Sequence, residues 1–136
     1  MVDFLVKSKY NDLASTENDV NKTFGQLIRD ARKHKGYSQR ELAVLVKLDF
    51  TYLSKLENDR ADYAPKEDVI RNLATQLDLD PEELVFLVGR IPERDEQLLK
   101  QNYKEMPMLF RRMQEDPQFA RNIFKLAINE EEEQKS

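Results

Sequence analysis

The sequence predicts an all-α protein, with a domain of five short helices followed by a helical C-terminal extension. Two observations support this prediction: the 136-residue chain holds only 3 glycines and 5 prolines, and its apolar residues recur at helical spacing between capping signals. This length suffices for one domain of ordinary size with a small appendage. We expect an N-terminal arm at residues 1–22, the five-helix domain at 23–89, the extension at 90–129 and an acidic disordered tail at 130–136.

The first helix of the domain has a capping signal at each end. Thr23 and Gln26 have the spacing of a capping box, in which each side chain bonds the backbone of the other residue. Gly36 supplies the left-handed conformation that ends many helices. The apolar residues between these signals predict a helix over residues 24–35: Phe24, Leu27, Ile28 and Ala31.

The next two helices are short and follow each other closely. Ser38 and Glu41 form a second capping box, and the carboxylate of Asp49 can cap the third helix. A polar loop over residues 60–64 follows. The inward-facing positions of these two helices are Leu42, Ala43 and Val46, then Leu53 and Leu56.

Proline marks the start of the fourth and fifth helices. Pro65 suits the first turn of the fourth helix, and Asp80 followed by Pro81 gives a cap and an N1 proline for the fifth, which ends before Gly89. Each helix then has one apolar stripe. The stripes are Val69, Ile70, Leu73, Ala74 and Leu77 in the fourth helix, and Leu84, Val85, Leu87 and Val88 in the fifth.

The extension is expected to be helical over residues 93–103, 107–114 and 117–129. Its apolar side chains are too many for a disordered segment, and short helices cannot bury them alone. They are Met106, Met108, Leu109, Phe110, Met113, Phe119, Ile123 and Phe124. We therefore expect residues 90–129 to pack on the domain and on a second copy, giving a two-fold homodimer. In the N-terminal arm, one further helix is permitted by the spacing of Val2, Val6, Tyr10 and Leu13.

Composition excludes several classes of protein. With no cysteine and one histidine, the chain has neither a disulfide framework nor a thiolate metal site, and we expect no metal and no cofactor. The sequence lacks a glycine-rich phosphate loop and a nucleophile with a histidine partner, so we expect no enzyme activity. No apolar run approaches the ~20 residues that cross a bilayer, and no signal peptide is recognisable, which predicts a soluble cytoplasmic protein with no membrane partner.

The net charge of −4 argues at first against a nucleic-acid partner, because neutralising phosphates requires lysine and arginine. The charge is unevenly distributed along the chain. Residues 23–63 carry eight basic and six acidic side chains, whereas residues 64–136 carry eleven basic and sixteen acidic ones. The second and third helices therefore lie in a segment whose balance is positive.

Residues 38–57 have the spacing of a helix-turn-helix, in which two short helices are joined by about three residues. In that motif the first helix crosses the DNA backbone and the second enters the major groove. Exposed aromatic rings near a helix start also indicate a contact surface. Because Leu53 and Leu56 must face the core, five residues are left pointing outward. They are Phe50, Thr51, Tyr52, Ser54 and Lys55.

The segment over residues 24–89 resembles the phage-repressor and Cro-like helix-turn-helix proteins, also called the Xre family. The resemblance rests on Ser-Gln-x-Glu-Leu-Ala at residues 38–43, Leu-Ser-Lys-Leu-Glu at 53–57 and Leu-Ala in the fourth helix. It implies a repressor-like fold, with base contacts made by the five outward residues of the third helix.

The resemblance also implies roles for residues outside the third helix's outer face. Gln39, which opens the second helix, would touch phosphate and support the base contacts. Asn58 and Arg60 in the following loop would touch backbone phosphates. Arg32 and Glu57 would form a structural ion pair.

Two residues depart from the family pattern. Lys47 at the turn and Asp59 after the third helix stand where the family usually has glycine. A left-handed conformation at a lysine costs about 1–2 kcal/mol. Asp59 also puts negative charge beside the expected path of the DNA backbone.

Side-chain chemistry indicates what each residue can contact. Thr51 can meet a thymine methyl or bond a base edge, and Lys55 can donate to guanine. Phe50 can either pack on the second helix or meet a thymine methyl, while Tyr52 and Ser54 can contact phosphate or base. The candidates for phosphate contacts are Arg29, Arg40 and Arg60.

Taken with the resemblance, these patterns predict a sequence-specific transcriptional regulator that reads a palindromic operator in double-stranded DNA through its third helix. The alternative is a protein-interaction module, such as an antitoxin or a repressor controlled by a partner protease, whose acidic surface binds a regulatory protein. Weak dependence of DNA affinity on salt would favour the alternative, because phosphate contacts make binding salt-sensitive.

Overall fold

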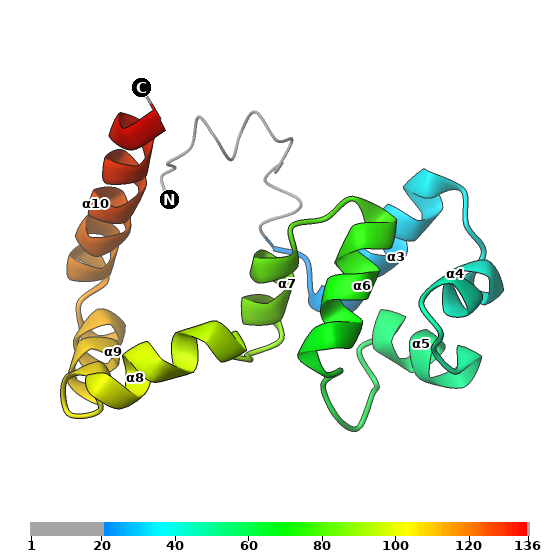
Figure 1. The fold of residues 1–136 in the computed structure, drawn as a ribbon, viewed down its shortest axis with the longest axis horizontal. Coiled ribbons are helices and arrows are strands. Elements are labelled where there is room, and N and C mark those ends of the chain that lie inside the picture. The colour runs from blue at the N-terminus through cyan, green and yellow to red at the C-terminus, as the bar shows by residue number, and fades with distance from the viewer. Residues whose placement is uncertain (1–20, 136) are drawn as a thin grey trace. The chain divides into compact units, whose positions relative to one another are not determined.

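A computed structural model describes residues 21–135, with side chains described to residue 129, and these residues form helices and no strand (Figure 1). The all-α class is therefore confirmed for this part of the chain. The helix permitted in the N-terminal arm lies outside the described residues. Contacts divide the chain into two units, of which residues 21–96 form one.

The first unit contains the five expected helices, and their capping signals act as predicted. The capping boxes at Thr23 and Ser38 are both complete. The carboxylates of Asp49 and Asp80 each accept a backbone N–H at 3.1 Å. The helices are α3 (Phe24–Lys35), α4 (Gln39–Leu45), α5 (Phe50–Glu57), α6 (Glu67–Leu77) and α7 (Pro81–Leu87), followed by the 3-10 turn η1 (Glu93–Asp95).

The domain's core is made by inward faces of all five helices. Helix α5 packs against both α3 and α4, and α6 packs against α3 and α7. The core side chains are Ile28, Leu42, Ala43, Val46, Leu53, Ile70, Leu73, Ala74, Leu77, Leu84 and Val85. Burial of the inward face of α5 fixes which of its residues face solvent.

The end of the domain differs from the prediction. Pro65 precedes α6, which begins at Glu67, and the Pro65 carbonyl accepts a hydrogen bond from Nε of Arg90. The backbone N–H of Glu93 donates to the Glu67 carboxylate at 2.9 Å. These bonds hold residues 90–96, which the sequence assigns to the extension, within the first unit.

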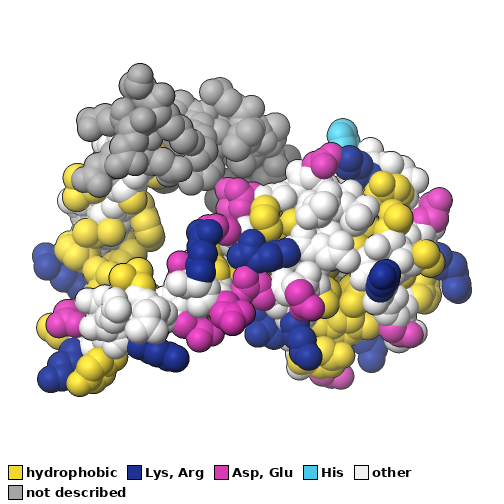
Figure 2. Space-filling model, viewed as in Figure 1, with side chains coloured by type: hydrophobic (Ala, Val, Ile, Leu, Met, Phe, Trp, Pro, Cys, Tyr) yellow, Lys and Arg dark blue, Asp and Glu magenta, His cyan; other side chains and the backbone are white. Residues whose placement is uncertain are grey.

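The helices beyond the domain are α8 (Glu96–Gln101), α9 (Glu105–Glu115) and α10 (Pro117–Lys135). Helices α9 and α10 contact each other, and the guanidinium carbon of Arg112 lies 3.9 Å from the ring centroid of Phe119. None of the side chains described in these helices is buried, and Figure 2 shows hydrophobic side chains gathered on their visible face. The large exposed ones are Leu98, Met108, Phe110, Phe124 and Leu126.

Helix α10 corrects one prediction about the C-terminal end. Residues 130–135 continue this helix of 19 residues, whereas the sequence predicts a disordered tail. Glutamate, glutamine and lysine all have favourable helix propensities, so a run of them can extend a helix that has already formed. No helix in the described residues, α10 included, combines the length and the apolar character needed to cross a membrane.

Candidate nucleic-acid interface

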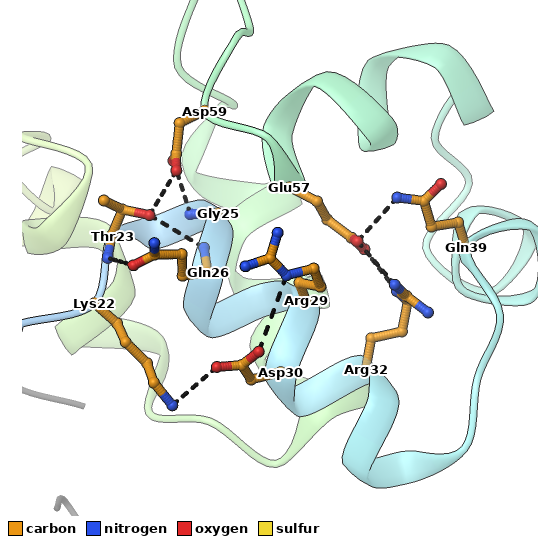
Figure 3. Close-up of polar contacts among 10 residues, drawn as sticks. All are labelled: Lys22, Thr23, Gly25, Gln26, Arg29, Asp30, Arg32, Gln39, Glu57 and Asp59. Atoms are coloured by element: carbon orange, nitrogen blue, oxygen red, sulfur yellow. Dashed lines mark hydrogen bonds and ion pairs between the residues drawn. The ribbon is translucent and has the colours of Figure 1, made fainter. Parts of the chain in front are cut away.

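A buried ion pair joins α3 to the end of α5 (Figure 3). Nε of Arg32 donates to Oε2 of Glu57 at 2.8 Å and Nη2 donates to Oε1 at 3.0 Å, while Nη1 donates to the Tyr37 carbonyl at 2.8 Å. Glu57 is only 1% exposed. The structure thus contains the pair that the resemblance implies, and its bidentate geometry fixes the orientation of α5 on α3.

Gln39 is held by the same carboxylate. Nε2 of Gln39 donates to Oε1 of Glu57 at 2.9 Å (Figure 3). Because a carboxylate only accepts, the amide nitrogen of Gln39 must face Glu57. Within the described residues the amide oxygen and one N–H have no partner, and the first position of α4 holds them in a fixed orientation.

Phe50, for which the sequence leaves packing on the second helix and contact with a thymine methyl both open, is the first residue of α5. It is half-buried and packs against the domain's core. The guanidinium carbon of Arg40 lies 4.3 Å from its ring centroid. Of the two alternatives for this ring, packing on α4 is therefore the one that the structure contains.

Tyr52 is also half-buried, because the loop after α5 supplies a partner for its ring. The ring stacks on that of Tyr63, with centroids 5.0 Å apart, and its hydroxyl donates to the Tyr63 carbonyl at 3.2 Å. Burial raises the pKa of Tyr52, a shift that favours the neutral hydroxyl over the phenolate. Tyr52 thus connects α5 to the loop, a role that its sequence position does not indicate.

Three residues remain on the outer face of α5. Thr51 and Lys55 are exposed and Ser54 is half-buried. Their i, i+3, i+4 spacing places them on the same side of the helix. Their side chains form no hydrogen bond or ion pair with other residues in the described part of the chain. This face is polar, positively charged and open.

The left-handed positions on either side of α5 are Lys47 and Asp59, each with φ of 56°. Asp59 makes two compensating bonds (Figure 3): Oδ2 accepts the Thr23 hydroxyl at 2.6 Å and Oδ1 accepts the Gly25 N–H at 3.1 Å. The carboxylate therefore faces the start of α3, where the helix dipole favours negative charge.

Other carboxylates near α5 are also engaged within the domain. Glu41 accepts the backbone N–H of Ser38 at 2.8 Å, and this bond lowers the pKa of Glu41. Asp49 caps α5 through the backbone N–H of Tyr52. By contrast, exposed cations near α5 have no ion-pair partner among residues 21–129: Arg40, Lys55 and Arg60. The unpaired charge on α5 itself, that of Lys55, is therefore positive, although the net charge is −4.

Replacing Lys47 with glycine is expected to stabilise the domain. Because Lys47 is exposed, the change mainly removes a left-handed strain of about 1–2 kcal/mol. The extra backbone freedom of glycine in the unfolded chain offsets about 0.5–1 kcal/mol of this gain. Urea denaturation should show a net gain of up to about 1.5 kcal/mol. Lys47→Ala keeps the strain and should stay near wild type, and a glycine variant less stable than the alanine variant would contradict the expectation.

Two short helices packed through buried leucines, with an open outer face on the second, define a helix-turn-helix domain. Comparisons with known proteins agree. Residues 25–90 match a family model described as a helix-turn-helix domain. Over this segment the chain is therefore similar to helix-turn-helix domains.

Two individual proteins are similar to the chain. The "ImmF control region 10 kDa protein" of Bacillus phage phi105 is 39% identical over 59 residues, which are 43% of this chain. The match spans 63% of that relative's length. A solved structure of a SinR protein/SinI protein complex matches with 23% identity and a TM-score of 0.43, covering 74% of this chain and 99% of the other.

Proposed function

We propose that the protein is a sequence-specific transcriptional regulator that places α5 in the major groove of a palindromic operator. The open face of Thr51, Ser54 and Lys55 is the observation that most supports this proposal. The face combines a methyl, two hydroxyls and a cation, which are groups that recognise base edges. It also lies on a helix held rigidly by the Arg32–Glu57 pair, and rigid placement favours discrimination between bases.

Each residue has a distinct part in this proposal. Thr51 meets a thymine methyl or a base edge, and Lys55 donates to O6 and N7 of guanine. Gln39 uses its free amide edge on a phosphate. In the loop, Arg60 and Asn58 contact phosphates as well, although one Asn58 donor already bonds the Ser54 carbonyl at 2.8 Å.

Replacing Thr51 or Lys55 with alanine is expected to reduce discrimination between the operator and unrelated DNA. The operator is first obtained by selecting bound duplexes from a random pool with the full chain. Fluorescence titration should then show each variant losing about 5- to 150-fold in the ratio of affinities, since one good base contact contributes about 1–3 kcal/mol. Both residues are exposed, so neither change should affect folding.

Arg60→Ala serves as the control, because a phosphate contact carries no sequence information. It should weaken operator and unrelated DNA alike and reduce the slope of log affinity against log salt by about 1. If all three variants bind as wild type does, α5 is not the recognition helix. Affinity that hardly depends on salt would favour the protein-interaction alternative.

The same proposal includes a homodimer assembled through residues 90–129. The exposed apolar side chains of α8–α10 are more than a short helical segment normally leaves in water. A two-fold dimer would present two copies of α5 about 34 Å apart, one turn of DNA, and so match a palindrome. Sedimentation of the full chain at micromolar concentration should show a dimer, and a monomer there would contradict this assembly.

A further inference from the structure

We infer that Arg40 is a specificity-determining residue, held over the start of α5 by Phe50, and that Phe50 is a positioning residue; this inference rests on the proposed function. It changes the expected roles of both residues. The sequence makes Arg40 a candidate for phosphate contact and Phe50 a candidate for base contact. Their mutual contact assigns the base contact to the guanidinium instead.

The geometry of the pair supports this assignment. Arg40 lies in the first turn of α4 and Phe50 is the first residue of α5. The 4.3 Å between the guanidinium carbon and the ring centroid is within the range of an attractive cation–π contact. Because Phe50 also packs against the core, its ring is a fixed platform rather than a mobile neighbour. Arg40 itself remains exposed.

The cation–π contact uses no hydrogen bond to a carbonyl or carboxylate, so the N–H donors of the Arg40 guanidinium stay available to a ligand. The described residues provide no hydrogen bond or ion pair for these donors. The adjacent carboxylates are already used, since Glu41 bonds the backbone N–H of Ser38 and Asp49 that of Tyr52.

The ring of Phe50 also determines where the N–H donors of Arg40 lie. The N-terminal turn of a recognition helix contacts base edges, and Phe50 opens that turn of α5. An arginine there can bond O6 and N7 of guanine in a bidentate manner, which is the most frequent specific contact. An arginine extended from α4 without this platform would meet the DNA backbone and carry no sequence information.

A double-mutant cycle tests the inference, using the duplex selected by the wild-type chain and a scrambled duplex of equal length. Arg40→Gln should lower the ratio of the two affinities by about tenfold or more. Phe50→Leu leaves the charge of Arg40 and most of the apolar volume in place but removes the ring. It should lower the ratio of the two affinities by a comparable factor. The double variant should be no worse than Arg40→Gln alone, because the ring acts through the guanidinium. Arg60→Gln, the matched control without a ring beneath it, should lower both affinities by the same factor.

Two results would overturn the inference and leave the proposed function intact. One is an equal loss on both duplexes in Arg40→Gln, which would make Arg40 a phosphate contact. The other is additive losses in the double variant, which would mean that the ring acts independently of Arg40. Thermal unfolding checks whether Phe50→Leu is folded. If it is not, Arg40→Gln, a change at an exposed site, still decides whether Arg40 contacts a base or a phosphate. If the wild type selects no sequence from the pool, the proposed function fails and the inference fails with it.

Discussion

Replacing Glu57 with alanine is expected to lower the free energy of unfolding by about 3–5 kcal/mol, the usual cost of removing one member of a buried ion pair. Arg32 is only 8% exposed, so its guanidinium would keep the Tyr37 carbonyl as an acceptor but lose both bonds to a carboxylate. The amide of Gln39 would lose its acceptor as well. Urea denaturation at neutral pH measures the loss.

An exposed ion pair on α3 provides the control. Oδ2 of Asp30 lies 2.9 Å from Nζ of Lys22, and Oδ1 lies 4.0 Å from Nε of Arg29. The Asp30 side chain is 45% exposed. Since solvent screens such pairs, Asp30→Ala should cost no more than about 1 kcal/mol. Should Glu57→Ala prove as mild as Asp30→Ala, the Arg32–Glu57 contact would not be a buried pair in solution.

Local chemistry made the helices predictable from the sequence. A capping box depends on residues three apart, so Thr23 with Gln26 and Ser38 with Glu41 identify helix starts without knowledge of the rest of the fold. Helical periodicity likewise identifies buried positions such as Leu53. The same logic does not reach the end of the last helix, because residues 130–135 contain neither an apolar periodicity nor a capping signal.

Contacts between residues distant in sequence were not predictable from periodicity. Tyr52 stacks on Tyr63, and Thr23 bonds Asp59 across 36 residues, yet neither pair has a spacing that indicates contact. The Arg32–Glu57 pair was expected only through the family resemblance. For the outer face of α5, periodicity gave the direction of each side chain from the helix axis but not the surfaces that neighbouring segments supply.

The net charge illustrates the same limit. Counting charges by segment shows that residues 23–63 are slightly basic, but a count treats every carboxylate alike. In the structure, those of Glu41, Asp49 and Asp59 accept bonds at helix starts. Exposed cations beside α5 lack such partners among residues 21–129, so the local field favours a phosphate backbone more than the count predicts.

Replacing Gly25 with alanine is expected to destabilise the domain by about 3 kcal/mol, the upper end of overpacking costs. An added Cβ would lie 2.3 Å from the Leu56 carbonyl oxygen, 2.6 Å from Oδ1 of Asp59 and 2.8 Å from the Glu57 carbonyl oxygen. Two of these atoms belong to the backbone at the end of α5, so the clash is relieved only if α3 and α5 separate.

Gly36→Ala distinguishes this steric effect from a general cost of replacing glycine. Gly36 has φ of 80° and open space around it, so alanine there should cost only about 1–2 kcal/mol of left-handed strain. Separation of α3 from α5 would also displace the open face of α5, so Gly25→Ala should lose affinity for the selected duplex even when fully folded, whereas Gly36→Ala should not. Urea denaturation and fluorescence titration measure the two effects. A Gly25→Ala variant as stable as Gly36→Ala would mean that α3 and α5 do not approach this closely at Gly25, and no displacement of the open face of α5 would then be expected.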